Sequence, residues 1–125
     1  MKAITLKEPW ASLVVNGYKT YEFRSWKTSY RGKILIHAAK GIDKNNIDRF
    51  KSYNLNYGNS CIIGEAYIVD CVKVNGELRK KLLEIDSNVY QESGFNETYA
   101  FVLENFKKYD KYIPCKGHLN IWNYD

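Results

Sequence analysis

At 125 residues, with 45% hydrophobic and 26% charged residues, the chain has the composition of an ordinary globular domain, and we expect one domain over residues 1–125. No apolar run approaches the roughly 18 residues that a membrane-spanning helix needs, and Met1 and Lys2 lead into a short predicted strand rather than a signal sequence. We therefore expect no membrane partner and a cytoplasmic location. The 19 Lys and Arg residues against 14 Asp and Glu residues give a net charge of +5, which permits a polyanionic partner without requiring one.

The chain begins with a predicted strand–helix–strand unit. A short strand is expected from Ala3 to Leu6, a helix from Glu8 to Asn16, and a second strand from Thr20 to Arg24. The helix is indicated by apolar residues that recur at intervals of three and four along one face. Pro9 suits the first helical turn, and Gly17 suits a left-handed stop just past the end.

The rest of the chain is predicted to consist of strands separated by turns and two further helices. Gly64, inside the longest strand, suggests a bulge or a sharp bend. In chain order, these elements are a turn at Tyr30–Lys33, a strand at Ile34–Ala39 ended by Gly41, a polar helix from Asp43 to about Tyr53, a loop at Tyr57–Ser60, a strand at Cys61–Val74, a helix at Glu77–Ile85, an irregular segment at Asp86–Asn96, a strand at Tyr99–Leu103, a turn at Pro114–Gly117 and a closing strand at Leu119–Tyr124.

The order of these elements indicates the fold class. Five or six strands with few helices between them do not alternate as they would in a doubly wound α/β protein. We therefore predict an α+β fold, in which two or three helices pack around a small, mostly antiparallel β-barrel.

Cofactor chemistry finds no support in the sequence. The three cysteines lack the CxxC spacing of zinc sites, and only His37 and His118 are available as histidine ligands. No glycine-rich phosphate-binding loop is present either. We therefore expect neither a metal nor another cofactor.

The segment that follows Gly17 concentrates functional groups. Lys19, Glu22, Arg24 and Trp26 place an ammonium, a carboxylate, a guanidinium and an indole within eight residues. Glu22 and Arg24 share one face of the predicted strand, whereas Lys19 reaches the same cleft only if the chain bends after Gly17. An ion pair at a strand edge would explain the charges without a function, but we interpret the group as a functional site.

Further candidates lie in and around the neighbouring turn and strand. Arg31, in a turn, is either a bidentate phosphate ligand or a solvated residue. Trp26, beside Ser25, is a candidate stacking platform for a base. His37 is either a satisfied core histidine or a cleft residue near a strand end. Trp10, on the helix face, is assigned to the core.

A longer pattern joins these residues. Gly17, Lys19, Glu22 and Arg24 fit the spacing GxKxxExR. With this pattern and its flanks, the chain resembles the ASCH domain family, named for the activating signal cointegrator homology region. The resemblance runs in order over nearly the whole chain, and its flanking parts are Pro9-Trp10-Ala11-Ser12-Leu13, Ser25-Trp26 and Arg31-Gly32.

The resemblance implies a PUA-like fold, in which a small β-barrel carries a cleft beside the GxKxxExR segment, and it implies binding of RNA or other nucleic acid. One bacterial branch of the family is an amidohydrolase that removes the acetyl group from N4-acetylcytidine. Its catalytic residues are a Lys, a Thr three residues later and a distant Glu. Here Lys19 matches the Lys, Glu22 stands in place of the Thr, and Glu92 lies in the region of the distant Glu.

We therefore expect a nucleic-acid-binding domain whose partner is RNA rather than DNA, or a nucleoside. Lys19, Arg24 and Arg31 would contact phosphate. Glu22 would accept hydrogen bonds from a base or orient Lys19, and Trp26 would stack on a base.

Two alternatives stay open at this point. The first is an enzyme acting on a modified nucleoside, with Lys19 as the base and Glu22 or Glu92 as its acid–base partner. The second is a protein-interaction module whose charged cleft receives an acidic peptide. The sequence fixes neither the preferred base nor the oligomeric state.

Overall fold

The fold is built on one six-stranded mixed sheet, seen in a computed structural model that describes residues 1–91 and 98–125. The strands lie in the order β2-β5-β4-β3-β1-β6, and β1 pairs with β3 in parallel while the other four neighbouring pairs are antiparallel. The strands are β1 (Lys2–Glu8), β2 (Tyr21–Arg24), β3 (Gly32–Ile42), β4 (Cys61–Lys73), β5 (Tyr99–Pro114) and β6 (Ile121–Asn123).

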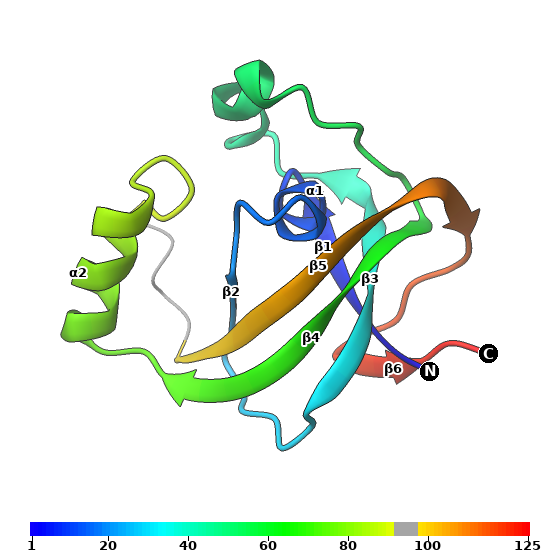
Figure 1. Ribbon diagram of the computed structural model, residues 1–125. Helices are drawn as coiled ribbons and strands as arrows, with labels where there is room; N and C mark the ends of the chain where they lie inside the picture. The colour runs from blue at the N-terminus through cyan, green and yellow to red at the C-terminus, as the bar shows by residue number, and fades with distance from the viewer. Residues whose placement is uncertain (92–97) are drawn as a thin grey trace.

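The sheet is strongly curled, and the short helix α1 (Trp10–Val15) lies in its curve (Figure 1). All but the first residue of α1 are buried, because the sheet covers one side of the helix and Leu13 packs with Phe50 and Leu82 on another. The curling brings the edge strand β2 back towards β1, where Arg24 Nη2 donates a hydrogen bond to the Thr5 carbonyl oxygen at 3.0 Å. This side-chain contact takes the place of strand pairing: among the described residues the sheet does not close into a hydrogen-bonded barrel. The predicted α+β, PUA-like class is confirmed, but with an open sheet.

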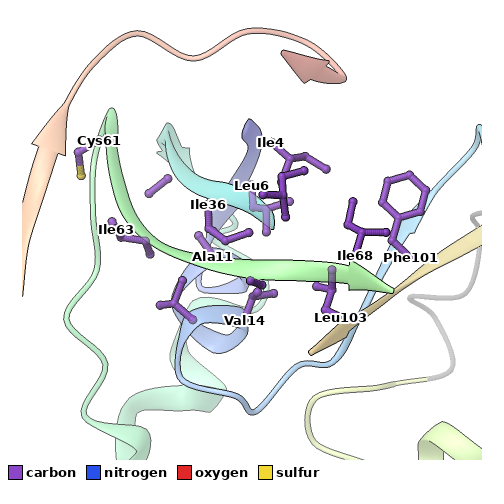
Figure 2. Packing of buried hydrophobic residues seen from close by; sticks show 14 residues of the cluster. Ile4, Leu6, Ala11, Val14, Ile36, Cys61, Ile63, Ile68, Phe101 and Leu103 are labelled. Carbon is purple, nitrogen blue, oxygen red and sulfur yellow. The ribbon is translucent and has the colours of Figure 1, made fainter. Parts of the chain in front are cut away.

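The main core fills the space between α1 and the sheet (Figure 2). Alternate residues of the strands point into it, as the period-two geometry of a strand requires. On β3, Ile34 and Ile36 face this core, whereas Leu35 packs with Trp122 in a second cluster on the other face. Because both faces are covered, the central strands read as continuous apolar runs.

Two further helices lie outside the sheet. A 3₁₀-helix (Ile47–Tyr53) follows β3, and α2 (Gly76–Ile85) follows β4 (Figure 1). The Asn75 side chain caps α2 by accepting a hydrogen bond from the Leu78 backbone N–H at 2.8 Å. No helix in the described part of the chain combines the length and the apolar character that a membrane span requires.

Both glycine predictions are confirmed. Gly17 ends α1 with a positive φ of 79°, and the chain turns there towards β2. Gly64 lies at a register shift between β4 and β5, where an added Cβ would come 2.3 Å from the Lys107 carbonyl oxygen. The bend in β4 therefore requires glycine.

Several predicted bounds were wrong. β3 continues through Gly41 to Ile42, and the first helix begins at Trp10 because β1 runs on to Glu8. β5 extends to Pro114 instead of ending at Leu103, since its second half pairs with β4 although its side chains are mostly polar and exposed. The closing strand is shorter than predicted, and part of the predicted irregular segment lies outside the described residues.

Candidate functional site

The segment after α1 folds sharply and carries Lys19 inward. The backbone N–H groups of Tyr18 and Lys19 both donate to the Leu13 carbonyl oxygen, at 2.9 and 3.0 Å, which closes the helix end. The bend predicted after Gly17 is therefore present, and it leaves Lys19 only 4% exposed.

The Lys19 ammonium is held by acceptors on several sides. It donates to the Tyr21 carbonyl oxygen and to Glu22 Oε1, the latter at 3.0 Å. It also lies 4.9 Å from the centre of the Phe23 ring and 6.0 Å from that of Trp10, distances at which an aromatic face attracts a cation. Burial lowers the pKa of Lys19, and the carboxylate of Glu22 opposes that shift.

Glu22 joins the two cations of the segment. Its Oε1 accepts from Lys19 and from the Phe23 backbone N–H at 3.2 Å, while its Oε2 lies 3.5 Å from Arg24 Nη2. Burial alone would raise the pKa of Glu22, but the positive charges of Lys19 and Arg24 outweigh it, so the pKa lies below its ordinary value. Glu22 is therefore an ionised carboxylate whose side chain is 12% exposed.

A cleft of about 530 Å³ opens beside these groups, between β1, β2 and the loop that precedes β6. Its lining combines polar and charged side chains with apolar ones. The lining residues are Thr5, Leu6, Lys7, Trp10, Glu22, Phe23, Arg24, Ala39, His118, Leu119 and Asn120. Glu22 and Arg24 thus share one face, as predicted, whereas Lys19 supports Glu22 without lining the cleft.

Trp10 packs edge-on against Phe50 in a hydrophobic cluster, as predicted for a core residue, and it also lines the cleft. Its Nε1 donates to Asp43 Oδ2 at 3.0 Å, and the Arg49 guanidinium lies 5.4 Å from its ring centre. These contacts fix the indole plane at the start of α1. Local sequence patterns did not indicate that Trp10 lines the cleft, because Asp43, the hydrogen-bond partner of its indole, lies 33 positions away in the sequence.

His37 is buried behind the cleft and does not line it. Its Nε2 lies 2.7 Å from the Cys115 carbonyl oxygen, which can only accept, so Nε2 carries the hydrogen. Thr5 Oγ1 accepts from Trp122 Nε1 at 3.0 Å and lies 3.3 Å from His37 Nδ1, to which it can donate its own hydrogen. His37 therefore links Thr5 on β1 to the loop after β5.

Three other predicted residues lie outside the cleft lining. Ser25 is exposed, and Trp26 packs edge-on against Phe101 at 5.2 Å, beside the main core. Arg31 donates to two backbone carbonyl oxygens nearby and lies 3.6 Å from Asp70 Oδ1. Their roles in binding stay predictions, and Glu92 lies outside the described residues.

Sequence reasoning missed the far wall of the cleft. His118, Leu119 and Asn120 come from a loop some hundred positions away from the GxKxxExR segment, and no local pattern marks them. Within the described ranges, no three His, Cys, Asp or Glu side chains gather closely enough to hold a metal ion.

A family model and two known proteins match this chain in sequence. The family model described as "ASCH domain" matches residues 4–121. Activating signal cointegrator 1 from Homo sapiens is 29% identical over 134 residues, and the Mus musculus protein is 28% identical; each match covers 98% of this chain. The chain spans only 22% of the length of these two relatives.

Solved structures agree on the fold. The crystal structure of ASCH from Zymomonas mobilis superposes with a TM-score of 0.57 at 20% identity, covering 90% of this chain and 72% of that one. A substituted form of the same protein gives a TM-score of 0.55 at 19% identity, covering 90% and 74%. At this identity the likeness concerns the fold alone.

Proposed function

We propose that this chain, which belongs to the ASCH domain family, binds nucleic acid by taking a single nucleotide into the cleft beside the GxKxxExR segment, and that it prefers RNA to DNA. The family is associated with RNA binding in general. The observation that carries the proposal is the pairing of an ionised Glu22 with Arg24 in a cleft that also presents the aromatic residues Trp10 and Phe23.

Glu22 and Arg24 together offer an acceptor and donors that can bind the hydrogen-bonding edge of a base. Glu22 Oε2 can accept from an amino or imino group, while the Arg24 N–H groups can donate to an adjacent ring nitrogen or carbonyl oxygen. Trp10 and Phe23 supply apolar surface against which a base can pack. A volume of about 530 Å³ falls within the range of pockets that enclose one small organic molecule.

Phosphate contacts would come from the rim. Lys7 is exposed and lines the cleft, and Lys40 is exposed next to Ala39, which also lines it. Lysines at such positions neutralise backbone phosphates and release counterions. Lys19 is buried and does not line the cleft, so we assign it to orienting Glu22 and not to a phosphate contact.

The carboxylate of Glu22 argues against an acidic side chain placed directly beside it. Glu22 is ionised and part of the lining, so a second carboxylate placed beside it would be repelled. A base presents neutral donors and acceptors at the same place and carries its negative charge on the phosphate, away from Glu22. The part of the cleft beside Glu22 therefore suits a base better than the carboxylate of an acidic peptide.

Binding of short oligonucleotides tests the proposal. Fluorescence anisotropy would measure the affinity for RNA and DNA strands of one sequence at two salt concentrations. We expect salt-dependent binding, tighter for RNA, and a loss of about tenfold or more in Arg24→Gln. Lys80→Gln, on the exposed face of α2, is the matched control that removes one charge elsewhere. If the chain binds none of these strands, the proposal is wrong.

A further inference from the structure

Leu119 stands out on the lip of the cleft. Its side chain is 88% exposed, whereas the other exposed large hydrophobic residues of the described chain range from 36% to 59%. A single exposed leucine needs no explanation on an ordinary surface. This one lines the cleft that we assign to a nucleotide, at the end of the loop from Cys115 to Asn120.

The loop that carries Leu119 contacts the sheet at two of its residues. His37 Nε2 lies 2.7 Å from the Cys115 carbonyl oxygen at its start. Gly117 lies so close to β1 and β3 that an added Cβ would come 2.7 Å from Thr5 Oγ1 and from His37 Cε1. These contacts hold the loop against the sheet, so its exposed tip is presented in a fixed position.

The residues on both sides of Leu119 shape the loop at this point. The His118 ring packs edge-on against Trp122 with ring centres 5.0 Å apart. Asn120 adopts a left-handed backbone with φ at 61°, which turns the chain into β6. Leu119 therefore lies between a ring that packs against Trp122 and the turn into β6, and exposed Lys116 precedes it by three positions in the same loop.

We propose that Leu119 is a wedge, which fills the gap in the base stack when a neighbouring nucleotide enters the cleft. The proposed function places a single base in the cleft, so a bound strand must unstack that base from its neighbours. Unstacking exposes apolar base faces, and proteins compensate by inserting an apolar side chain between the bases. An exposed leucine at the mouth of the cleft, on a loop held against the sheet, meets that requirement.

The test compares two RNA pentamers and rests on the proposed function. One pentamer has five adenines. The other has the same backbone but lacks the bases at its second and fourth positions, so none of its remaining bases has a stacked neighbour in any register. Anisotropy of end-labelled pentamers would give the affinities of the unaltered chain, Leu119→Ala and Leu119→Met.

We expect Leu119→Ala to weaken binding of the complete pentamer about fivefold to tenfold, because the buried apolar contact is lost. Binding of the base-deficient pentamer should change less than twofold, and Leu119→Met should behave nearly as the unaltered chain does. Ile85→Ala, an exposed aliphatic residue on α2, is the matched control and should change neither affinity.

The outcomes separate the two proposals. If the unaltered chain binds neither pentamer, the nucleic-acid function fails, and the wedge fails with it. If it binds both pentamers but Leu119→Ala weakens them equally, or weakens neither, the function stands and the wedge is wrong. Circular dichroism of each variant would show that a lost affinity does not reflect unfolding.

Discussion

The Lys19 ammonium and the Glu22 carboxylate form an ion pair at 3.0 Å in which the two side chains are only 5% and 12% exposed. Such a pair contributes less to stability than its geometry suggests, since both charges lose their hydration. Removing one partner is much more costly, because the other charge is then buried alone. The pair therefore holds Glu22 in place at the cleft while making each residue dependent on the other.

A double-mutant cycle measures this dependence. We expect Lys19→Met and Glu22→Gln each to lower the free energy of unfolding by about 3 kcal/mol, and the double variant to lose clearly less than the sum of the two. Urea denaturation would give the values. The exposed pair of Lys51 and Asp48, at 3.5 Å, is the control: Lys51→Met should cost at most about 0.5 kcal/mol. Additive losses at Lys19 and Glu22 would contradict the coupling.

Acid should weaken the contribution of Glu22. Its pKa in the folded chain lies below the ordinary value of 4.5, so on acidification the unfolded chain takes up this proton first. The stability gained from the ionised carboxylate is therefore present in full well above pH 4.5 and is lost as the pH falls through the lowered pKa. Urea denaturation from pH 7 down to pH 3 should show the advantage over Glu22→Gln shrinking. In a Lys19→Met background, which lacks one of the stabilising charges, the decline should be smaller.

A second buried carboxylate, that of Glu8, accepts its hydrogen bonds from uncharged donors. Glu8 is completely buried and accepts from the Ser12 backbone N–H, the Ser12 hydroxyl and the Gly58 backbone N–H, at 2.8, 2.6 and 2.8 Å. Burial raises its pKa, and these hydrogen bonds oppose the rise. Ser12→Ala should raise the pKa of Glu8 further and cost about 1–2 kcal/mol of stability. Carboxyl carbon NMR and urea denaturation would measure the two effects, with exposed Ser52→Ala as the control. A pKa that falls in Ser12→Ala would refute this account.

What could be predicted from the sequence depends on distance along the chain. The bend after Gly17 and the shared face of Glu22 and Arg24 follow from local rules for helix ends and strands, and both are present. The position of Lys19 was only half predicted: the bend turns it inward, but its neighbours take up its hydrogen bonds and keep it from the cleft lining.

The remaining walls of the cleft depend on contacts that no local pattern records. Trp10 is placed by Asp43, and Leu119 is brought near β1 because β6 pairs with β1 from the far end of the chain. The second half of β5 was missed for a related reason. Its charged residues resemble a loop in composition, and only the long partner strand β4 makes them a strand.

Replacing Arg31 would show whether a bound strand extends beyond the cleft. It is exposed and lies 3.6 Å from Asp70, so a phosphate would compete with that carboxylate. We expect Arg31→Gln to reduce the slope of log affinity against log salt by about one, and Asp70→Asn to strengthen binding slightly. Anisotropy titrations at four salt concentrations would measure both. An unchanged slope in Arg31→Gln would limit the strand to the cleft itself.

The surroundings of Lys19 predict that N4-acetylcytidine is not hydrolysed. A general base needs a free lone pair directed at its substrate. Lys19 instead donates to the Tyr21 carbonyl oxygen and to Glu22, and it does not line the cleft. We expect no release of cytidine when the nucleoside is incubated with the chain and the products are separated by chromatography. Efficient release that disappears in Lys19→Ala would show this expectation to be wrong.

Replacing Glu22 provides the converse experiment. Glu22→Thr places a hydroxyl on the cleft lining and removes the carboxylate that favours the protonated ammonium, so the pKa of Lys19 should fall further. Both changes favour attack on an amide. We expect Glu22→Thr to gain slow but measurable release of cytidine, and Glu22→Val, which has the same shape without the hydroxyl, to gain none. Equal release by the two variants would mean that the hydroxyl is not the nucleophile. No release by Glu22→Thr would mean that the cleft lacks more than a hydroxyl for this reaction.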